Sequence, residues 1–194
     1  MQSSTWRALG TGDVLGFLRA DLKRAKSSVW IVGPWVDGFF AEFVLGILPK
    51  TAALYIVTRP PSGATPDFAA HAFAARACFE ARPNTLVRLL PKLHAKVIVI
   101  DDEIGYCGSA NWYRYSLEES REIVLRGPVA SAQGLLDEVQ LIWDQATSGP
   151  VANETIKTTE VARGYTSEVS DPVAAAKLKE VQGSFVIARS RRRR

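Results

Sequence analysis

Short apolar runs rich in β-branched residues alternate with longer helical patterns along the first part of the chain. Runs at residues 28–32, 52–58 and 85–90 predict buried strands. The segments between them, at residues 37–48 and 66–82, predict helices. This alternation is typical of an α/β fold, in which helices cover a central sheet.

The later strands follow one another without an intervening helix. Residues 96–100, 104–109 and 121–125 have strand character, and an acidic turn separates the first two. Strands joined this closely pair antiparallel. Helical periodicity at residues 12–26 and at residues 129–146 predicts two further helices. We therefore predict an α/β sandwich whose mixed β-sheet is flanked by helices on both faces.

A dense polar pattern, H-x-K-x4-D-x6-G-S-x-N, spans residues 94–111. Its specified positions are His94, Lys96, Asp101, Gly108, Ser109 and Asn111. If residues were drawn independently, a match at a given start would have a probability on the order of 10⁻⁷ to 10⁻⁸. The chain has 2 histidines, and His94 is one of them. The pattern is therefore the leading candidate for a functional site.

Strand geometry predicts that these side chains meet. Side chains two residues apart on a strand share a face, which groups His94 with Lys96. The same spacing groups Ser109 with Asn111. A hairpin with its tip at residues 102–103 would place Lys96 opposite Ser109. That register would also place His94 opposite Asn111, with cross-strand pairs about 5.5 Å apart.

The residue types in this cluster suit phosphoryl chemistry. Neutral imidazole is a good nucleophile toward phosphorus, so His94 is the candidate nucleophile. Lys96 offers a positive charge to a phosphate oxygen, while Asn111 and Ser109 offer neutral donors. Gly108 has no side chain, so another backbone can approach it closely, and it is a candidate substrate contact. This scheme needs no metal or other cofactor, and the sequence lacks the clusters expected of a metal site.

The pattern resembles the motif of the phospholipase D superfamily, which cleaves or transfers phosphodiesters through a histidine nucleophile. The resemblance covers roughly residues 13–146 and is strongest to the short dimeric phospholipase D-like nucleases. It implies that Glu122 orients His94. Members of the superfamily often carry Asn-x-Glu here, and in this chain Ser120 takes the place of the asparagine. Asp101 matches the aspartate of the family motif and is therefore included among the catalytic candidates. Its position at a strand end favours a structural role at the turn.

The single copy of the motif has a mechanistic consequence. In the superfamily one histidine attacks and a second protonates the leaving oxygen, a contribution typically worth about 10² to 10⁴ in rate. One solution is a homodimer in which His94 of each subunit meets its mate across a two-fold axis. The other is that His71, in a helical segment, acts as the acid. We predict the homodimer, with the active site at the two-fold interface.

The charge distribution favours a nucleic acid substrate. Arg189 and residues 191–194 form a basic tail, and without these five arginines residues 1–188 hold 19 basic and 20 acidic side chains. Such a tail suits a polyanion, although a solvated end is an equal alternative. Short single-motif members of the superfamily are often nucleases. We therefore predict an endonuclease on DNA or RNA, with DNA favoured.

Aromatic and basic residues near the motif are candidate substrate contacts. Trp35 and Trp112 could stack on bases, as could Phe39, Phe40 and Tyr113, although core packing is the more common use of such side chains. Arg59 and Arg114 are candidate phosphate contacts. Two alternatives remain open: a phospholipase D or phosphatidyltransferase acting on lipids, and a phosphate- or nucleic-acid-binding module without turnover.

The remaining features concern domains and compartment. Residues 1–148 are predicted to form the catalytic domain and residues 149–194 a C-terminal extension with the arginine-rich tail, including a short helix near residues 173–181. The sequence shows neither a membrane-spanning apolar run nor a secretory pattern. Cys78 and Cys107 are predicted to be free thiols, which fits a cytoplasmic protein.

Overall fold

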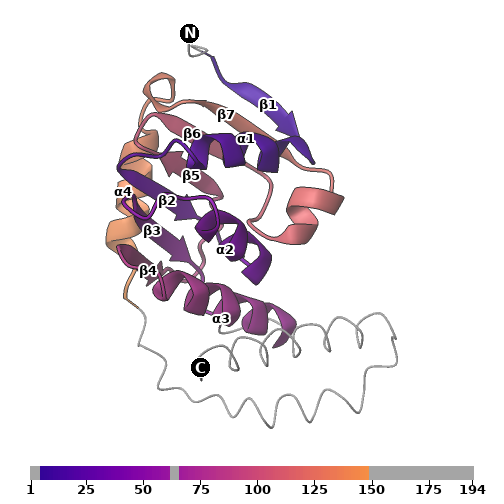
Figure 1. Ribbon diagram of the computed structural model, residues 1–194, viewed down its shortest axis with the longest axis vertical. Helices are drawn as coiled ribbons and strands as arrows, with labels where there is room; N and C mark the ends of the chain where they lie inside the picture. The colour runs from indigo at the N-terminus through magenta and orange to yellow at the C-terminus, as the bar shows by residue number, and fades with distance from the viewer. Residues whose placement is uncertain (1–4, 62–65, 149–194) are drawn as a thin grey trace. The chain divides into compact units, whose positions relative to one another are not determined.

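The computed structural model describes residues 5–61 and 66–148, which form a seven-stranded sheet with helices packed against it (Figure 1). The strands are β1 (Arg7–Gly10), β2 (Ser28–Val32), β3 (Ala53–Thr58), β4 (Thr85–Leu89), β5 (Val97–Ile100), β6 (Ile104–Gly108) and β7 (Ile123–Pro128). The helices are α1 (Asp13–Leu22), α2 (Gly38–Leu45), α3 (Pro66–Glu80) and α4 (Leu135–Gln145), with a π-helical turn at Tyr115–Glu119 and a 3₁₀ turn at Val129–Ser131.

The sheet is mixed, as predicted. Its strand order is β1-β7-β6-β5-β2-β3-β4. The β2–β3 and β3–β4 pairs are parallel, and all other pairs are antiparallel. The parallel strands are those separated by helices, since a crossover helix returns the chain in its original direction. Where the chain turns back without a crossover, from β5 to β6, the pairing is antiparallel.

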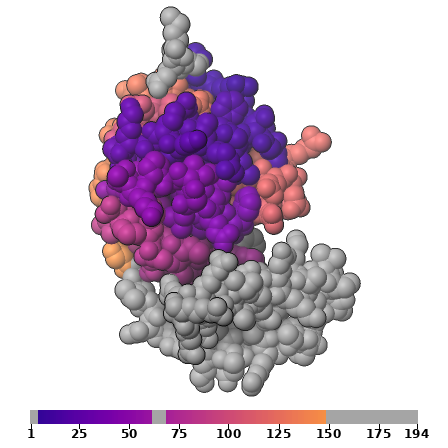
Figure 2. All heavy atoms as spheres, in the orientation of Figure 1, coloured from indigo at the N-terminus to yellow at the C-terminus, as the bar shows by residue number. Residues whose placement is uncertain are grey.

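Helices lie on both faces of the sheet, which confirms the predicted architecture. The helices α1, α2 and α3 lie on one face, where Leu18, Phe40 and Phe79 pack against Ile31 and Ile98 of the sheet. In the space-filling view these three helices form a continuous surface over that face (Figure 2). On the other face, α4 packs its buried side chains over β2, β3 and β5. Alternate residues of β2, β3 and β5 therefore supply two separate apolar cores.

Two details of the fold differ from the prediction. The strand β1 was not predicted, because it is four residues long and buries one of them, Leu9, so its alternation is too short to recognise. The predicted helix at residues 129–146 is divided into a 3₁₀ turn and α4. Gly134 lies between them with a φ of 81°, a left-handed conformation that breaks a continuous helix. The predicted C-terminal extension with its arginine tail lies outside the described residues.

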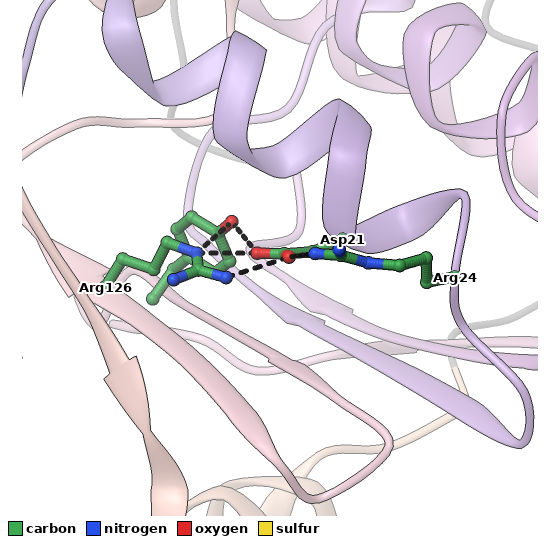
Figure 3. Close-up of polar contacts among 4 residues, drawn as sticks. Asp21, Arg24 and Arg126 are labelled. Atoms are coloured by element: carbon green, nitrogen blue, oxygen red, sulfur yellow. Dashed lines mark hydrogen bonds and ion pairs between the residues drawn. The ribbon is translucent and has the colours of Figure 1, made fainter. Parts of the chain in front are cut away.

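A buried ionic cluster joins α1 to β6 and β7 (Figure 3). The Asp21 carboxylate accepts two hydrogen bonds from the Arg126 guanidinium, at 2.6 and 2.8 Å, and one from Arg24 at 2.7 Å. The Tyr106 hydroxyl also donates to Asp21. We call these four residues the Asp21 cluster. Burial opposes the charge of Asp21, but its three donors outweigh burial and lower the pKa of Asp21.

Candidate active site

His94 and Lys96 lie in the segment that leads into β5. The His94 side chain is exposed, whereas Lys96 is buried at 8% exposure. The Lys96 ammonium nitrogen lies 3.3 Å from each ring nitrogen of His94 and donates a 2.8 Å hydrogen bond to the His94 carbonyl oxygen. A histidine open to solvent therefore has a cation directly beside its ring, and that cation is held by the histidine's own backbone.

The predicted hairpin register is wrong by one residue. The structure pairs Val97 with Cys107 and Ile100 with Ile104, so the loop has three residues instead of two. Asp101 and Asp102 both take positive φ values, 54° and 56°, a conformation that aspartate tolerates better than most residues. The predicted opposition of Lys96 to Ser109, and of His94 to Asn111, is therefore not formed.

Glu122, which precedes β7, instead accepts a hydrogen bond from Ser109 at the end of β6. Its carboxylate accepts hydrogen bonds from the hydroxyls of Ser109, of Ser116 at 3.1 Å and of Ser120 at 2.8 Å. We call these three serines the Glu122 cradle. Burial raises the pKa of Glu122, but the cradle and the positive charge of Lys96 outweigh burial and lower it. The cradle therefore holds a carboxylate in its charged form.

Lys96 is the electrostatic counterpart of this carboxylate. Burial lowers the pKa of Lys96, and the negative charge of Glu122 opposes that effect. Within the described residues Lys96 forms no direct ion pair. The Glu122 carboxylate likewise accepts no hydrogen bond from His94 in the described part of the chain, so the predicted orienting contact is not formed there. Two opposite charges thus face the same region without neutralising each other by contact.

Trp112 fixes the segment that carries Asn111. Its ring is fully buried, its Nε1 donates to the carbonyl oxygen of Val32 at 2.8 Å, and it stacks on Phe40. A Cβ at Gly33 would lie 2.3 Å from this ring, so only glycine fits there. The suggestion that Trp112 or Phe40 stacks on bases is therefore wrong, because both side chains are 0% exposed.

The Asn111 side chain is held at the surface edge of this anchored segment. Asn111 is half-buried, and its side-chain oxygen is buried without a hydrogen-bond partner among the described residues. An unsatisfied buried acceptor costs roughly 1–3 kcal/mol. Asn111 therefore carries an unsatisfied acceptor among the described residues, at a motif position two residues after Ser109, which bonds Glu122.

Gly108 and Asp101 have structural explanations. A Cβ at Gly108 would lie 2.2 Å from the Ile123 carbonyl oxygen, so the close approach is that of β7. The Asp101 carboxylate accepts hydrogen bonds from the backbone N–H groups of residues 26–28 and from the Ser27 hydroxyl. It lies beyond the opposite end of β5 from His94, and the strand between them alone spans roughly 13 Å. These contacts give Asp101 a structural explanation at the turn, and its catalytic assignment stays a prediction.

The other predicted substrate contacts, Arg59 and Arg114, each lie against an aromatic ring. The Arg59 guanidinium lies 5.3 Å from the centre of the half-buried Trp35 ring. Arg114 is exposed, lies 5.0 Å from the Phe39 ring centre and pairs with Glu118 at 3.0 Å. Arg59 is half-buried and Arg114 is exposed, so neither side chain is enclosed in the core.

Sequence reasoning missed two residues that position Glu122. Ser116 lies on the π-helical turn, a rare conformation that is frequent at functional sites. Thr11, which follows β1, accepts a hydrogen bond from the Glu122 backbone N–H at 2.9 Å and donates to the Ser120 carbonyl oxygen. Nothing in the sequence identified Thr11, because 111 residues separate it from Glu122.

The alternative second histidine, His71, lies on a helix. His71 is exposed on α3, the helix that packs through Ala75 and Phe79 on the face opposite α4. In residues 5–61 and 66–148 no group of three or more His, Cys, Asp or Glu side chains could hold a metal ion. None of the helices described for this chain is both long and apolar enough to cross a membrane. Both cysteines are free thiols, as predicted.

A protein-family model described as "Cardiolipin synthase, PLD-like domain" matches residues 18–143, which is more than half of the chain. The chain belongs to the phospholipase D superfamily. Membership makes this phospholipase D-like protein a phosphodiesterase-type hydrolase. No curated protein matches the sequence significantly.

Solved structures support the same fold. NucT from Helicobacter pylori superposes with a TM-score of 0.59 at 20% identity, over 74% of this chain and 99% of NucT. Nuc from Salmonella typhimurium, a phospholipase D family member, superposes with a TM-score of 0.59 at 15% identity, over 74% and 96% of the two chains. Phosphatidylserine synthase from Haemophilus influenzae superposes with a TM-score of 0.52 at 14% identity, over 74% of this chain and 39% of the synthase. These likenesses establish the fold of the phospholipase D-like domain.

Proposed function

We propose that this protein hydrolyses phosphodiester bonds in nucleic acid, with DNA favoured over RNA, through a covalent phosphohistidine on His94. The observation that carries the proposal is the exposed His94 ring with the Lys96 ammonium 3.3 Å from it. Glu122 and Asn111 lie at the same end of the sheet, because β5 begins and β6 ends there. Nucleophile, cation, carboxylate and open amide are the groups that phosphoryl transfer needs.

The proposed reaction has two steps. A ring nitrogen of His94 attacks phosphorus, the P–O bond to the leaving group breaks, and the leaving oxygen takes a proton from a second imidazole. Water then attacks phosphorus and gives its proton to the second imidazole, and the P–N bond breaks to restore His94. Lys96 stabilises the charge on the non-bridging oxygens throughout. No metal ion takes part in either step.

The second imidazole comes from a second copy of the chain. The motif occurs once, and its one histidine cannot act as nucleophile and acid in the same step. In a two-fold homodimer, His94 of each subunit supplies one of the two roles. The orienting role of Glu122 toward His94 is also part of this proposal, since the contact is not formed in the described part of the chain.

Several basic groups support a nucleic acid substrate. Arg59 is half-buried, Arg114 is exposed, and residues 191–194 are four consecutive arginines. Guanidinium groups bind phosphate oxygens along a nucleic acid backbone irrespective of base sequence. The free thiols of Cys78 and Cys107 fit a reducing compartment, so the proposal places the protein in the cytoplasm.

The direct test is cleavage of plasmid and of single-stranded DNA and RNA in EDTA. We expect wild type to cleave and His94→Ala to be inactive. His71→Ala is the matched control, because it removes the chain's other histidine from an exposed position on α3. Activity abolished by EDTA, or retained by His94→Ala, would contradict the proposal. A phosphohistidine trapped at His94 by a denaturing alkaline quench, which preserves the acid-labile P–N bond, would identify the nucleophile directly.

A lipid substrate is the second candidate, because the matching family model is described by cardiolipin synthase. The same His94 chemistry would then transfer a phosphatidyl group to an alcohol. Choline release or alcohol exchange on phospholipid vesicles tests this activity. Vesicle turnover without nucleic acid cleavage would select the lipid substrate. Binding of either polyanion without any turnover would select a binding module and refute both enzymatic proposals.

A further inference from the structure

The turn that leads to His94 contains a lysine in a strained conformation. Residues 90–93, Leu-Pro-Lys-Leu, form a turn in which the Leu93 N–H donates to the Leu90 carbonyl oxygen at 3.3 Å. Lys92 occupies the third position of this turn with a φ of 62°. Proline at the second position and a positive φ at the third are typical of a type II turn, which favours glycine or asparagine at the third position. A lysine at that position strains the backbone.

The fold itself does not use the Lys92 side chain. Leu90 and Leu93 pack into the apolar cluster beneath α4, whereas Lys92 is exposed. None of the ion pairs formed by residues 5–61 and 66–148 involves Lys92. Glycine would suit the turn better, so the lysine adds a cation that the stability of the fold does not require.

The turn lies at the edge of the sheet where the motif begins. Because β2, β3 and β4 are parallel, their carboxyl ends meet at one edge, and β5 begins there because it runs antiparallel to β2. The Leu90 N–H donates to the Thr58 carbonyl oxygen at 2.9 Å. The Thr58 hydroxyl donates to the Pro34 carbonyl oxygen at 3.2 Å. These contacts join the turn of Lys92 to the ends of β3 and β2.

Two further cations belong to this edge. Arg59 directly follows β3, and Lys96 directly precedes β5. Lys96 is buried and lies against the His94 ring, so its charge serves the nucleophile. Lys92 is exposed and lies two residues before His94. An extended polyanion at this edge would therefore meet cations in addition to the one beside the nucleophile.

The separation of Lys92 from His94 suits neighbouring phosphates of one strand. Two residues of chain span at most about 7 Å between α-carbons. Each strand of duplex DNA carries one phosphate per about 3.4 Å of helix axis. A phosphate bound by Lys92 would thus lie one or two nucleotides from the phosphate that His94 attacks. A phospholipid with a single phosphodiester has no such neighbour.

We propose that Lys92 binds a non-scissile phosphate of the nucleic acid substrate, next to the phosphodiester held at His94. The inference rests on the proposed function and deepens it, because it makes a chain of phosphates the ligand of this edge. Lysine binds phosphate as a point charge, and each such contact releases counterions from the nucleic acid. The contact is independent of base sequence. The strained turn holds this cation beside the site, although glycine would stabilise the fold.

The test measures binding of a fluorescein-labelled oligonucleotide at several salt concentrations, in the full-length chain with His94→Ala so that the ligand stays intact. Lys92→Met, added to this parent, removes the charge and keeps a side chain on the strained backbone. Loss of one phosphate contact should weaken binding about fivefold for single-stranded DNA and about eightfold for duplex DNA at about 0.1 M salt. The slope of log K against log salt should fall by about 0.7 and 0.9, respectively.

Two charge variants are the matched controls. Lys92→Arg keeps the cation and should bind with the affinity and the salt slope of the parent. Lys50→Met removes the same charge from an exposed lysine, which precedes β3 at the opposite edge of the sheet. Its salt slope should equal that of the parent.

A stability measurement separates the cation from the turn. Lys92→Gly removes the charge and relieves the strain, so it should bind DNA as weakly as Lys92→Met but unfold at a higher urea concentration. Asn84→Gly is the control for strain, because Asn84 is exposed and has a φ of 57° before the start of β4. Asn84→Gly should leave DNA binding unchanged.

Three outcomes would overturn the inference. A Lys92→Met variant with the affinity and the salt slope of its parent would show that Lys92 contacts no phosphate. An equal loss in Lys50→Met would reduce the effect to net charge. In the chain that retains His94, an equal loss of cleavage by Lys92→Met on DNA and on bis-p-nitrophenyl phosphate, which has one phosphodiester, would place Lys92 at the scissile phosphate. A chain that binds DNA through Lys92 and cleaves none would instead refute the proposed function and leave the inference standing.

Discussion

Two clusters of charged side chains in this protein are built in opposite ways. In the Asp21 cluster, the carboxylate and guanidinium groups meet directly, with a bidentate pair at 2.6 and 2.8 Å. At the active site, Lys96 and Glu122 influence each other's charge, but neutral serines satisfy the carboxylate and a carbonyl oxygen satisfies the ammonium. In the Asp21 cluster the opposite charges are paired by direct hydrogen bonds. At the active site the charges of Lys96 and Glu122 are not paired with each other, so both can interact with a ligand.

The difference teaches what each cluster does. A charge pair with all its hydrogen bonds made inside the protein has nothing left for a ligand, and removing one member leaves the other buried and unpaired. The Asp21 cluster therefore anchors α1 to β6 and β7. In the active site, Lys96 is 8% exposed and the Asn111 side-chain oxygen lacks a partner among the residues that the structure describes. An ammonium that is held by a neutral carbonyl oxygen keeps its charge available for a ligand.

The largest expected effect is on stability, at Asp21. Asp21→Asn removes the charge that compensates Arg126, and breaking a buried ion pair typically costs about 3–5 kcal/mol. Urea unfolding should show this loss, while the folded variant keeps its cleavage activity. Asp13→Asn, at the exposed start of α1, is the control and should cost under about 1 kcal/mol. An Asp21→Asn variant with the unfolding free energy of wild type would show that the Asp21 cluster does not stabilise the fold.

The reverse result is expected at Lys96. Lys96→Met keeps the stem that is buried and removes the cation, so cleavage should fall by about 10²–10³-fold, as when one preorganised transition-state contact is lost. Stability should be unchanged or higher, because the ammonium has no direct ion pair to lose. Initial rates and urea unfolding measure the two effects. Lys50→Met, on an exposed lysine, should change neither. A large loss of stability in Lys96→Met would make the two clusters alike.

The smallest effect is expected at the Glu122 cradle. Because the pKa of Glu122 is lowered, its hydrogen bonds stabilise the fold at pH values above its ordinary pKa, and that contribution disappears as the pH falls through the lowered value. Ser116→Ala removes one donor and moves the acid limb of the rate profile to higher pH. One hydrogen bond to a charged group is worth about 1.5 kcal/mol, so activity at the acid edge should fall roughly tenfold.

The pH–rate profile of Ser116→Ala separates positioning from simple structural loss. A merely structural defect would lower the rate equally at every pH. Ser131→Ala is the control, because its hydroxyl donates to the Pro128 carbonyl oxygen away from the site and its loss should leave the profile unchanged. An unshifted acid limb in Ser116→Ala would show that the cradle does not control the charge of Glu122.

The elements of this fold follow from local sequence pattern to a large extent. The predicted strands at residues 28–32 and 52–58 and the helix beginning near Pro66 agree with β2, β3 and α3 to within a few residues. These segments are apolar enough for their periodicity to be unambiguous. The failures occur where local pattern is weak. The strand β1 buries a single side chain, and the turn at Asp101 depends on backbone angles that the residue type permits but does not require.

The candidate site divides in the same way. His94, Lys96 and Glu122 were identified from residue type and spacing, because phosphoryl chemistry restricts which side chains can serve. Ser116 and Thr11 were not, because their roles depend on a π-helical turn and on a strand 111 residues away. The burial of Trp112 was also undetermined, since an aromatic beside a motif serves either a core or a ligand until its neighbours are known.

Sequence alone determined the chemistry that this protein carries and the number of histidines available for it, since both are properties of the residues themselves. The tertiary structure decided which groups meet. It replaced an expected hairpin pairing by a serine cradle around Glu122 and placed Asp101 beyond the opposite end of β5 from His94. These outcomes depend on register and on contacts between distant segments, and a shift of one residue is enough to change them.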